Sequence, residues 1–222
     1  MESIDSDTIK IIHNWSNGGT VKPIEVASNL RREWELDGRF IVGYSGNLGR
    51  AHEFETLLEA VEQLKAVPEI LFLFIGGGAL MEALKQAAVS RRLDNFVFKL
   101  YQPREQLRQS LGMPDLHLVV LRPEMEGLIV PSKIYGILAA GKPTLFIGDP
   151  LGEIPSILRE SDSGVIVESG DSEGLVKQIL ELRDNLDRVK RMGINARAVF
   201  DERYSQSRAF EAWEGIFNSL SE

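Results

Sequence analysis

The chain has 222 residues, of which 43% are hydrophobic, and a formal net charge of -8. This length and apolar content allow one large domain or two small ones with a sizeable core. The acidic balance argues against nucleic acid as a partner, since general nucleic-acid binding needs a basic face, and the lack of cysteine excludes disulfides and thiolate metal sites.

The first 38 residues differ in pattern from the rest of the chain. The piece "TIKIIHNW" (8–15) looks like a short strand, and it leads into a loop rich in Gly, Ser, Asn and Pro. A polar helical pattern comes next, near 24–34. We therefore set residues 1–38 apart from the main domain as a linker, loop and helix.

From residue 39 to residue 200, apolar runs rich in Val, Ile and Phe alternate with helical patterns. The expected strands are 39–46, 70–78, 95–100, 116–122, 143–148 and 163–169. The expected helices are 53–67, 80–91, 104–111, 133–141, 153–161 and 171–200. Nearly continuous apolar strands with helices between them are typical of a parallel sheet that is covered on both faces. The predicted fold class is therefore α/β, with a single Rossmann-like doubly wound parallel sheet.

The chain closes with an amphipathic helical pattern at 200–220, which we treat as a separate C-terminal helix (201–222). Its apolar face carries Phe210, Trp213, Ile216 and Phe217 at helical spacing. The plainer interpretation is that this aromatic face packs on the chain's own sheet.

Glycines cluster where the first two strands end, which is the edge at which open parallel sheets bind ligands. Gly43, Gly46 and Gly49 are spaced by three after the first strand, a pattern that fits neither GxGxxG nor a P-loop. The run 76–78 is all glycine and leads straight into a helix, where backbone N–H groups suit an anion. Either loop alone is more often a tight turn, but two on one edge favour a ligand.

The stretch "PSKIYGILAAGKP" (131–143) combines proline, a hydroxyl and a lysine at the start of a helix. Ordinary capping with a solvated lysine is one interpretation. However, Lys133 in the first turn opposes the helix dipole, and an anionic ligand removes that conflict. Together with the hydroxyl of Ser132 and free N–H groups, the pattern favours phosphate binding.

Neither a metal site nor a membrane segment is predicted. The three histidines lie far apart, and no acidic cluster stands beside Lys133. There is no run of about 18 apolar residues, and the start "MESIDSDTIKIIHNW" lacks the features of a signal peptide. We expect a cytoplasmic protein.

The segments "GYSGNLGRAHEFETLLEA", "LFLFIGGG", "FKLYQPREQL" and "EMEGLIVPSKIYGILAAGKPTLFIGDPLGEI" resemble the donor-binding domain of GT-B glycosyltransferases of family 4. The resemblance covers nearly the whole chain and is strongest to the branch that makes capsule, O-antigen and colanic-acid polysaccharides. It implies that a hexosyl group passes from a UDP- or GDP-sugar to a glycan or lipid-linked acceptor. It also implies retention of anomeric configuration, with no cofactor and no required metal.

The resemblance also implies roles for individual residues around the nucleotide. Ser132 and Lys133 would hold the diphosphate. The loop with Gly46 and Asn47 would meet the diphosphate and a partner domain, and Arg50 would contact a phosphate.

Further along the chain, Gly77 and Gly78 would open a helix near the nucleotide, and the turn with Tyr101 and Gln102 would meet the nucleobase. Glu126 matches the first glutamate of the family's paired motif, near the donor sugar, and would be the catalytic residue. The alternatives for this position are a solvated loop carboxylate at Glu126, or Glu124 in the same role.

Two positions depart from the family pattern. Gly136 stands where members often carry a second glutamate that binds the ribose, so ribose recognition must use other groups. The lysine commonly found after the Arg50 position is missing, and His52 and Glu53 lie in that region. His52 would either contact a phosphate or serve as a polar cap.

In the family, a segment like "IKIIHNW" links two domains, and an acceptor-binding domain precedes it. We therefore expect this chain to be the donor-binding half, inactive without that N-terminal domain, which would also mediate any peripheral membrane association. The C-terminal helix would then cross back to that domain. The alternatives are a stand-alone nucleotide-sugar-binding module, or a fragment of a nucleotide-sugar 2-epimerase, which the "PSK" segment disfavours.

Overall fold

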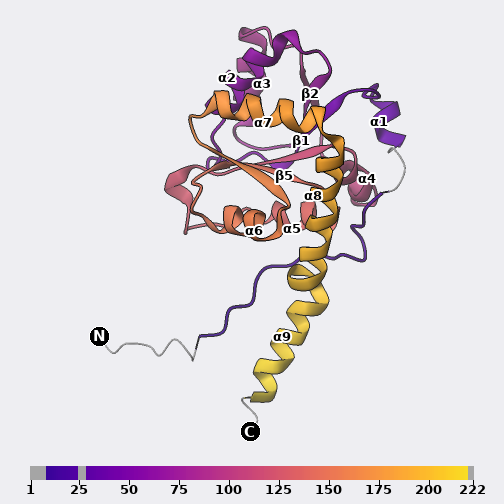
Figure 1. Ribbon diagram of the computed structural model, residues 1–222, viewed down its shortest axis with the longest axis vertical. Coiled ribbons are helices and arrows are strands. Elements are labelled where there is room, and N and C mark those ends of the chain that lie inside the picture. Colours follow the sequence, from indigo (N-terminus) through magenta and orange to yellow (C-terminus); the bar gives the residue numbers. More distant parts are fainter. Residues whose placement is uncertain (1–8, 25–28, 220–222) are drawn as a thin grey trace.

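A computed structural model describes residues 9–24 and 29–219, in which six parallel strands form one sheet (Figure 1). The strands are β1 (Phe40–Asn47), β2 (Ile70–Gly77), β3 (Phe96–Lys99), β4 (Leu116–Val120), β5 (Thr144–Gly148) and β6 (Gly164–Glu168). Their order is β3-β2-β1-β4-β5-β6, and every pair is parallel. All six expected strands are present, and the doubly wound α/β fold is confirmed. Because the strand order reverses between β1 and β4, the topological switch point lies there.

Helices cover both faces of this sheet, with α2, α3 and α7 on one side and α5 and α6 on the other (Figure 1). The first layer consists of α2 (Glu55–Gln63), extended by a 3-10 turn (Leu64–Ala66), α3 (Met81–Ser90) and α7 (Ser172–Asp184). The second consists of α4 (Leu107–Gly112), α5 (Lys133–Ala139) and α6 (Glu153–Ser161). Helix α8 (Leu186–Val199) passes from the first layer to the second, with Val189 in the core of one and Val199 in the core of the other (Figure 1). The short helix α1 (Asn29–Glu33) lies against α4. Two more 3-10 turns span Arg104–Gln106 and Pro123–Met125.

The strands are apolar throughout because both of their faces are buried. In β2, Phe72 and Phe74 belong to the core under the first helix layer, whereas Leu73 and Ile75 pack toward α1 and α4. All four side chains are almost completely excluded from solvent. Burial on two sides explains why the sequence shows continuous apolar runs rather than alternation.

The helical pattern 171–200, which we expected as one element, is two helices. Asn185 breaks it with φ -130° and ψ 71°, and its Oδ1 accepts a hydrogen bond of 3.0 Å from the Arg188 N–H. Asp171 caps α7 in the same way, accepting from the Gly174 N–H at 2.8 Å. Each cap satisfies an N–H group that the helix itself leaves unpaired.

The expected N-terminal strand is wrong for the described residues 9–15, which join no ladder. Ile9 and Ile11 are exposed, and the segment's backbone meets the rest of the chain in an isolated bridge between Ser16 and Ser205. Of the polar helix expected near 24–34, the structure describes α1, while residues 25–28 lie outside the described part.

The C-terminal helix α9 (Gln206–Ser219) follows a π-helical turn (Phe200–Tyr204) and extends away from the sheet (Figure 1). Its aromatic residues Phe210, Trp213 and Phe217 remain 51%, 43% and 61% exposed. The plainer interpretation, that this face packs on the chain's own sheet, is therefore wrong. Trp15 of the N-terminal segment is the edge-on neighbour of Phe210, at 6.2 Å between ring centroids.

Candidate functional site

A cavity of about 660 Å³ lies at the carboxyl edge of the sheet, at the switch point between β1 and β4. Six of the residues predicted from the sequence to bind the donor line it together: Gly46, Asn47, Tyr101, Gln102, Ser132 and Lys133. They come from the end of β1, the loop after β3 and the start of α5. Parallel strands place the loops at their carboxyl ends on one edge, and this brings together residues that lie far apart in the sequence.

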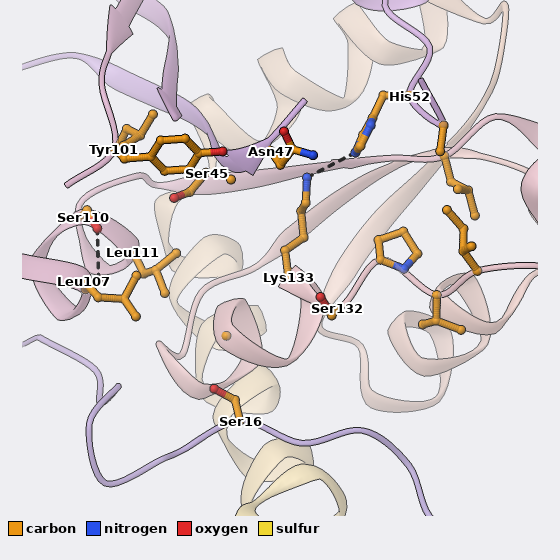
Figure 2. A pocket seen from close by; sticks show the side chains of 18 of the residues that line it. Ser16, Ser45, Asn47, His52, Tyr101, Leu107, Ser110, Leu111, Ser132 and Lys133 are labelled. Atoms are coloured by element: carbon orange, nitrogen blue, oxygen red, sulfur yellow. Dashed lines mark hydrogen bonds between the residues drawn. The ribbon is translucent and has the colours of Figure 1, made fainter. Parts of the chain in front are cut away.

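The ammonium of Lys133 lies inside this cavity beside His52 (Figure 2), and it also lies over the ring of Tyr44. Nζ is 3.6 Å from the centroid of the Tyr44 ring and 3.4 Å from His52 Nε2. No described residue lining the cavity is a carboxylate, and no ion pair within the described residues involves Lys133. Burial lowers the pKa of Lys133 to about 7. The site therefore holds a desolvated cation that lacks a counter-ion from the described part of the protein.

His52 is fixed from several directions at once. Its Nδ1 lies 3.1 Å from the Gly49 N–H nitrogen and 2.9 Å from the Gly49 carbonyl oxygen, and its Nε2 lies 3.1 Å from the Tyr44 hydroxyl. The ring also stacks on Phe54 at 6.4 Å. Burial first, and then the charge of Lys133, lower the pKa of His52. The imidazole is thus held neutral beside the lysine.

The ring of Tyr44 packs against the ammonium of Lys133. Its hydroxyl donates a 2.8 Å hydrogen bond to the carbonyl of Asn47. Burial, together with the proximity of Tyr101, raises the pKa of Tyr44, so the phenol stays protonated at neutral pH. A neutral phenol ring presents its negative π face to a cation.

Glycines allow the carboxyl ends of β1 and β2, and the loops that follow them, to approach each other closely. A Cβ on Gly76, whose φ is +136°, would overlap the carbonyl oxygen of Gly46. A Cβ on Gly78 would lie 2.5 Å from the backbone of Leu48, and one on Gly77 would lie 3.2 Å from the Tyr101 ring. Gly77 and Gly78 are not among the residues that line the cavity. Within the described residues, they position the neighbouring loop and the ring of Tyr101.

Ser132 occupies the N-cap position of α5, but its side chain makes no capping hydrogen bond. Its hydroxyl lines the cavity beside Lys133 (Figure 2). The capping interpretation of "PSKIYG" therefore lacks the hydrogen bond that defines a cap.

Arg50 and Glu126 lie outside the cavity lining. Arg50 is exposed on the loop after β1. Glu126 is half-buried, and its Oε1 accepts a 3.2 Å hydrogen bond from the Glu153 N–H at the start of α6. A side chain at Gly152 would overlap the Glu126 carboxylate. The catalytic role expected for Glu126 stays a prediction.

Several lining residues were not predicted from the sequence, among them Ser45, Ser110 and Ser16. Gly136 also lines the cavity, and a Cβ there would lie 3.5 Å from Leu111. Tyr44 was missed because it stands in an apolar strand, where an aromatic residue is read as core. His52 was noted from the sequence as a phosphate contact or a polar cap, and its spacing of three from Gly49 could have indicated its local hydrogen bonds.

The described residues contain no group of three or more His, Asp or Glu side chains placed to hold a metal ion. None of their helices combines the length and the apolar character that a membrane crossing requires.

Fold and cavity together define a Rossmann-like domain that can receive an anion at the switch point of its sheet. The family model described as glycosyl transferases group 1 matches residues 27–199, and the chain belongs to this family of GT-B proteins. WbjE of Pseudomonas aeruginosa, whose name describes a glycosyltransferase, is 30% identical over 97% of this chain and 54% of its own length. WcaI of Escherichia coli K12, named for colanic acid biosynthesis, is 29% identical over 80% of this chain and 44% of its own.

Solved structures agree with this fold. The Anabaena protein HepE, solved in complex with UDP and glucose, superimposes with a TM-score of 0.78 at 18% identity. That superposition covers 98% of this chain and 58% of HepE. The chain therefore spans about half the length of the curated relatives it matches.

Proposed function

We propose that this chain binds a nucleotide sugar, UDP- or GDP-linked, as the donor of a hexosyl group in a glycosyl transfer that retains anomeric configuration. The observation that carries the proposal is the Lys133 ammonium, buried in the switch-point cavity without a carboxylate among the described lining residues. A diphosphate supplies the missing negative charge. The names of the relatives, and the UDP and glucose in the HepE structure, support the same ligand class.

The cavity offers separate places for the parts of such a donor. Lys133 and the hydroxyl of Ser132 lie together and would hold the diphosphate, with Asn47 close by. Tyr101 and Gln102 line the cavity as well, and Tyr101 lies on the other side of the opening from His52, where the pair would meet the nucleobase (Figure 2). Glu126, on the loop before α5, would act at the sugar. The acceptor would be a glycan or lipid-linked sugar held by an acceptor-binding domain, without which we expect no transfer.

We further propose that binding needs no metal. Divalent ions such as Mg²⁺ are held through carboxylates, and the described lining of the cavity has none. It offers instead an ammonium and hydroxyl groups, which can neutralise or hydrogen-bond phosphate oxygens directly.

Calorimetry with UDP, GDP, UDP-glucose and GDP-mannose in EDTA tests the proposal on the 222-residue chain. We expect at least one of the two nucleotides, with its sugar conjugate, to bind under these conditions. Binding that appears only after magnesium or manganese is added would contradict the metal-free part. If none of the four binds with or without metal, the donor-binding proposal is wrong.

A further inference from the structure

The nitrogen atoms around Lys133 allow two proton arrangements, which differ in the tautomer of His52. In one, the Gly49 N–H donates to Nδ1 at 3.1 Å, and Nε2–H points at the Tyr44 oxygen at 3.1 Å. In the other, Nδ1–H donates to the Gly49 carbonyl at 2.9 Å, so that Nε2 carries a lone pair. Only this second tautomer can accept from the Lys133 ammonium, which lies 3.4 Å away.

The second tautomer keeps the hydrogen bond from Tyr44 to the backbone but gives up the one from the Gly49 N–H to Nδ1. The Tyr44 hydroxyl gives its single proton to the Asn47 carbonyl at 2.8 Å and therefore needs nothing from His52. The Tyr44 ring lies on another side of Nζ, at 3.6 Å. Lysine is flexible and has three donors, so an acceptor and a ring face together restrict where its charge can rest.

Resting on the proposed function, we propose that His52 is the positioning residue of Lys133. In its Nδ1–H tautomer it accepts a hydrogen bond from the ammonium at Nε2 and holds that charge where the donor's diphosphate binds. His52 thus acts through the lysine and does not itself contact the phosphate, because in this tautomer Nδ1–H donates to the Gly49 carbonyl and Nε2 accepts from Lys133.

Few other titratable groups can disturb this arrangement. Among the described residues that line the cavity, Tyr101 is the one titratable side chain besides His52 and Lys133, and it lies across the opening (Figure 2). Tyr44 faces the lysine from β1 and stays protonated because burial raises its pKa. His117, on β4, is completely buried, and burial lowers its pKa to about 4, so it is neutral at working pH.

A double-mutant cycle with His52→Phe and Lys133→Met tests this role, with UDP-glucose and GDP-mannose as probes. Phenylalanine keeps the ring that stacks on Phe54 and removes the acceptor. We expect His52→Phe to weaken binding of the donor about 5- to 30-fold and Lys133→Met about 10- to 150-fold. The double variant should bind no worse than Lys133→Met alone, because His52 acts only through the lysine. Additive losses would overturn the proposal.

His52→Gln is the control that restores a hydrogen-bond acceptor at this position. It keeps the test valid if the phenylalanine variant fails to fold. The glutamine amide oxygen can take the place of Nε2 as acceptor, so this variant should keep most of the affinity that His52→Phe loses. Equal losses in both variants, with unchanged melting temperatures, would overturn the positioning role. Nitrogen NMR of the His52 ring gives a second reading: we expect the Nδ1–H tautomer in the bound state, and an Nε2–H tautomer there contradicts the proposal.

The same measurements distinguish a failure of the positioning role of His52 from a failure of donor binding. If the wild-type chain binds neither donor, both fail together. If it binds and Lys133→Met loses affinity while His52→Phe does not, donor binding stands and the positioning role alone is wrong.

Discussion

Burial of Lys133 without a carboxylate makes the stability of the protein depend on pH in a specific direction. The pKa of Lys133 falls from 10.5 in the unfolded chain to about 7 in the folded one. Between these values the unfolded chain holds a proton that the folded chain has released. Stability therefore rises as pH increases through this window, and the cost of burying the charge is largest below it.

Lys133→Met removes the free-energy cost of burying the ammonium, so comparing this variant with the wild type measures that cost. We expect the variant to melt above the wild type near pH 6 and the difference to shrink as pH rises from about 7 toward about 10. Thermal melting of the two proteins without ligand, across that range, measures the effect. Lys190→Met is the matched control, because Lys190 is solvent-exposed and its removal should leave the profile unchanged. A constant difference between Lys133→Met and wild type would mean that the ammonium is solvated.

At the scale of elements, the close approach between the carboxyl ends of β1 and β2 depends on glycine for two reasons. Gly76 has a φ of +136°, and a side chain there would overlap the Gly46 carbonyl. Gly170 has a φ of +93° but has nothing within 4 Å of an added Cβ. Substitution at Gly170 therefore measures the cost of backbone strain alone, whereas substitution at Gly76 measures strain and steric overlap together.

We expect Gly170→Ala to lower the free energy of unfolding by about 1–2 kcal/mol through strain alone. Gly76→Ala adds the overlap and should cost about 2–5 kcal/mol. It should also weaken nucleotide binding, because Gly46 at the end of β1 lines the cavity. Urea unfolding and calorimetry measure the two effects. Equal costs at both positions would show that the ends of β1 and β2 move apart readily.

The strands could be predicted from the sequence because each apolar run is a local pattern set by burial on two faces. The break at Asn185 could not, since apolar residues such as Leu182 and Val189 continue the helical period on both sides of it. The site was predicted in part. Lys133 could be predicted because its charge opposes the helix dipole. Tyr44 could not, because an aromatic residue in an apolar strand such as β1 fits a position in the core as well as it fits a contact with a cation.

At the scale of the whole molecule, α9 contributes less buried surface than the domain from which it extends. Phe200, where the chain turns into it, is completely buried, whereas Trp213 is 43% exposed and stacks on Phe217. We expect Phe200→Ala to cost about 3–5 kcal/mol of stability and Trp213→Ala to change it by less than about 0.5 kcal/mol. Chemical denaturation of the 222-residue chain measures both. A large loss for Trp213→Ala would show that the aromatic face of α9 is packed within this chain.

The strand order also has a consequence for how the protein forms during synthesis. β1 is made first but occupies the middle of the sheet, and its neighbour β4 leaves the ribosome only after β2 and β3. The half-sheet β1–β3 can pair early, while its other edge waits for the second half of the chain. Tyr44 and His52 belong to the early half and Lys133 to the late one. We therefore expect the cation to lose its water only when the two halves join, and the cavity to be among the last features of the native state to form.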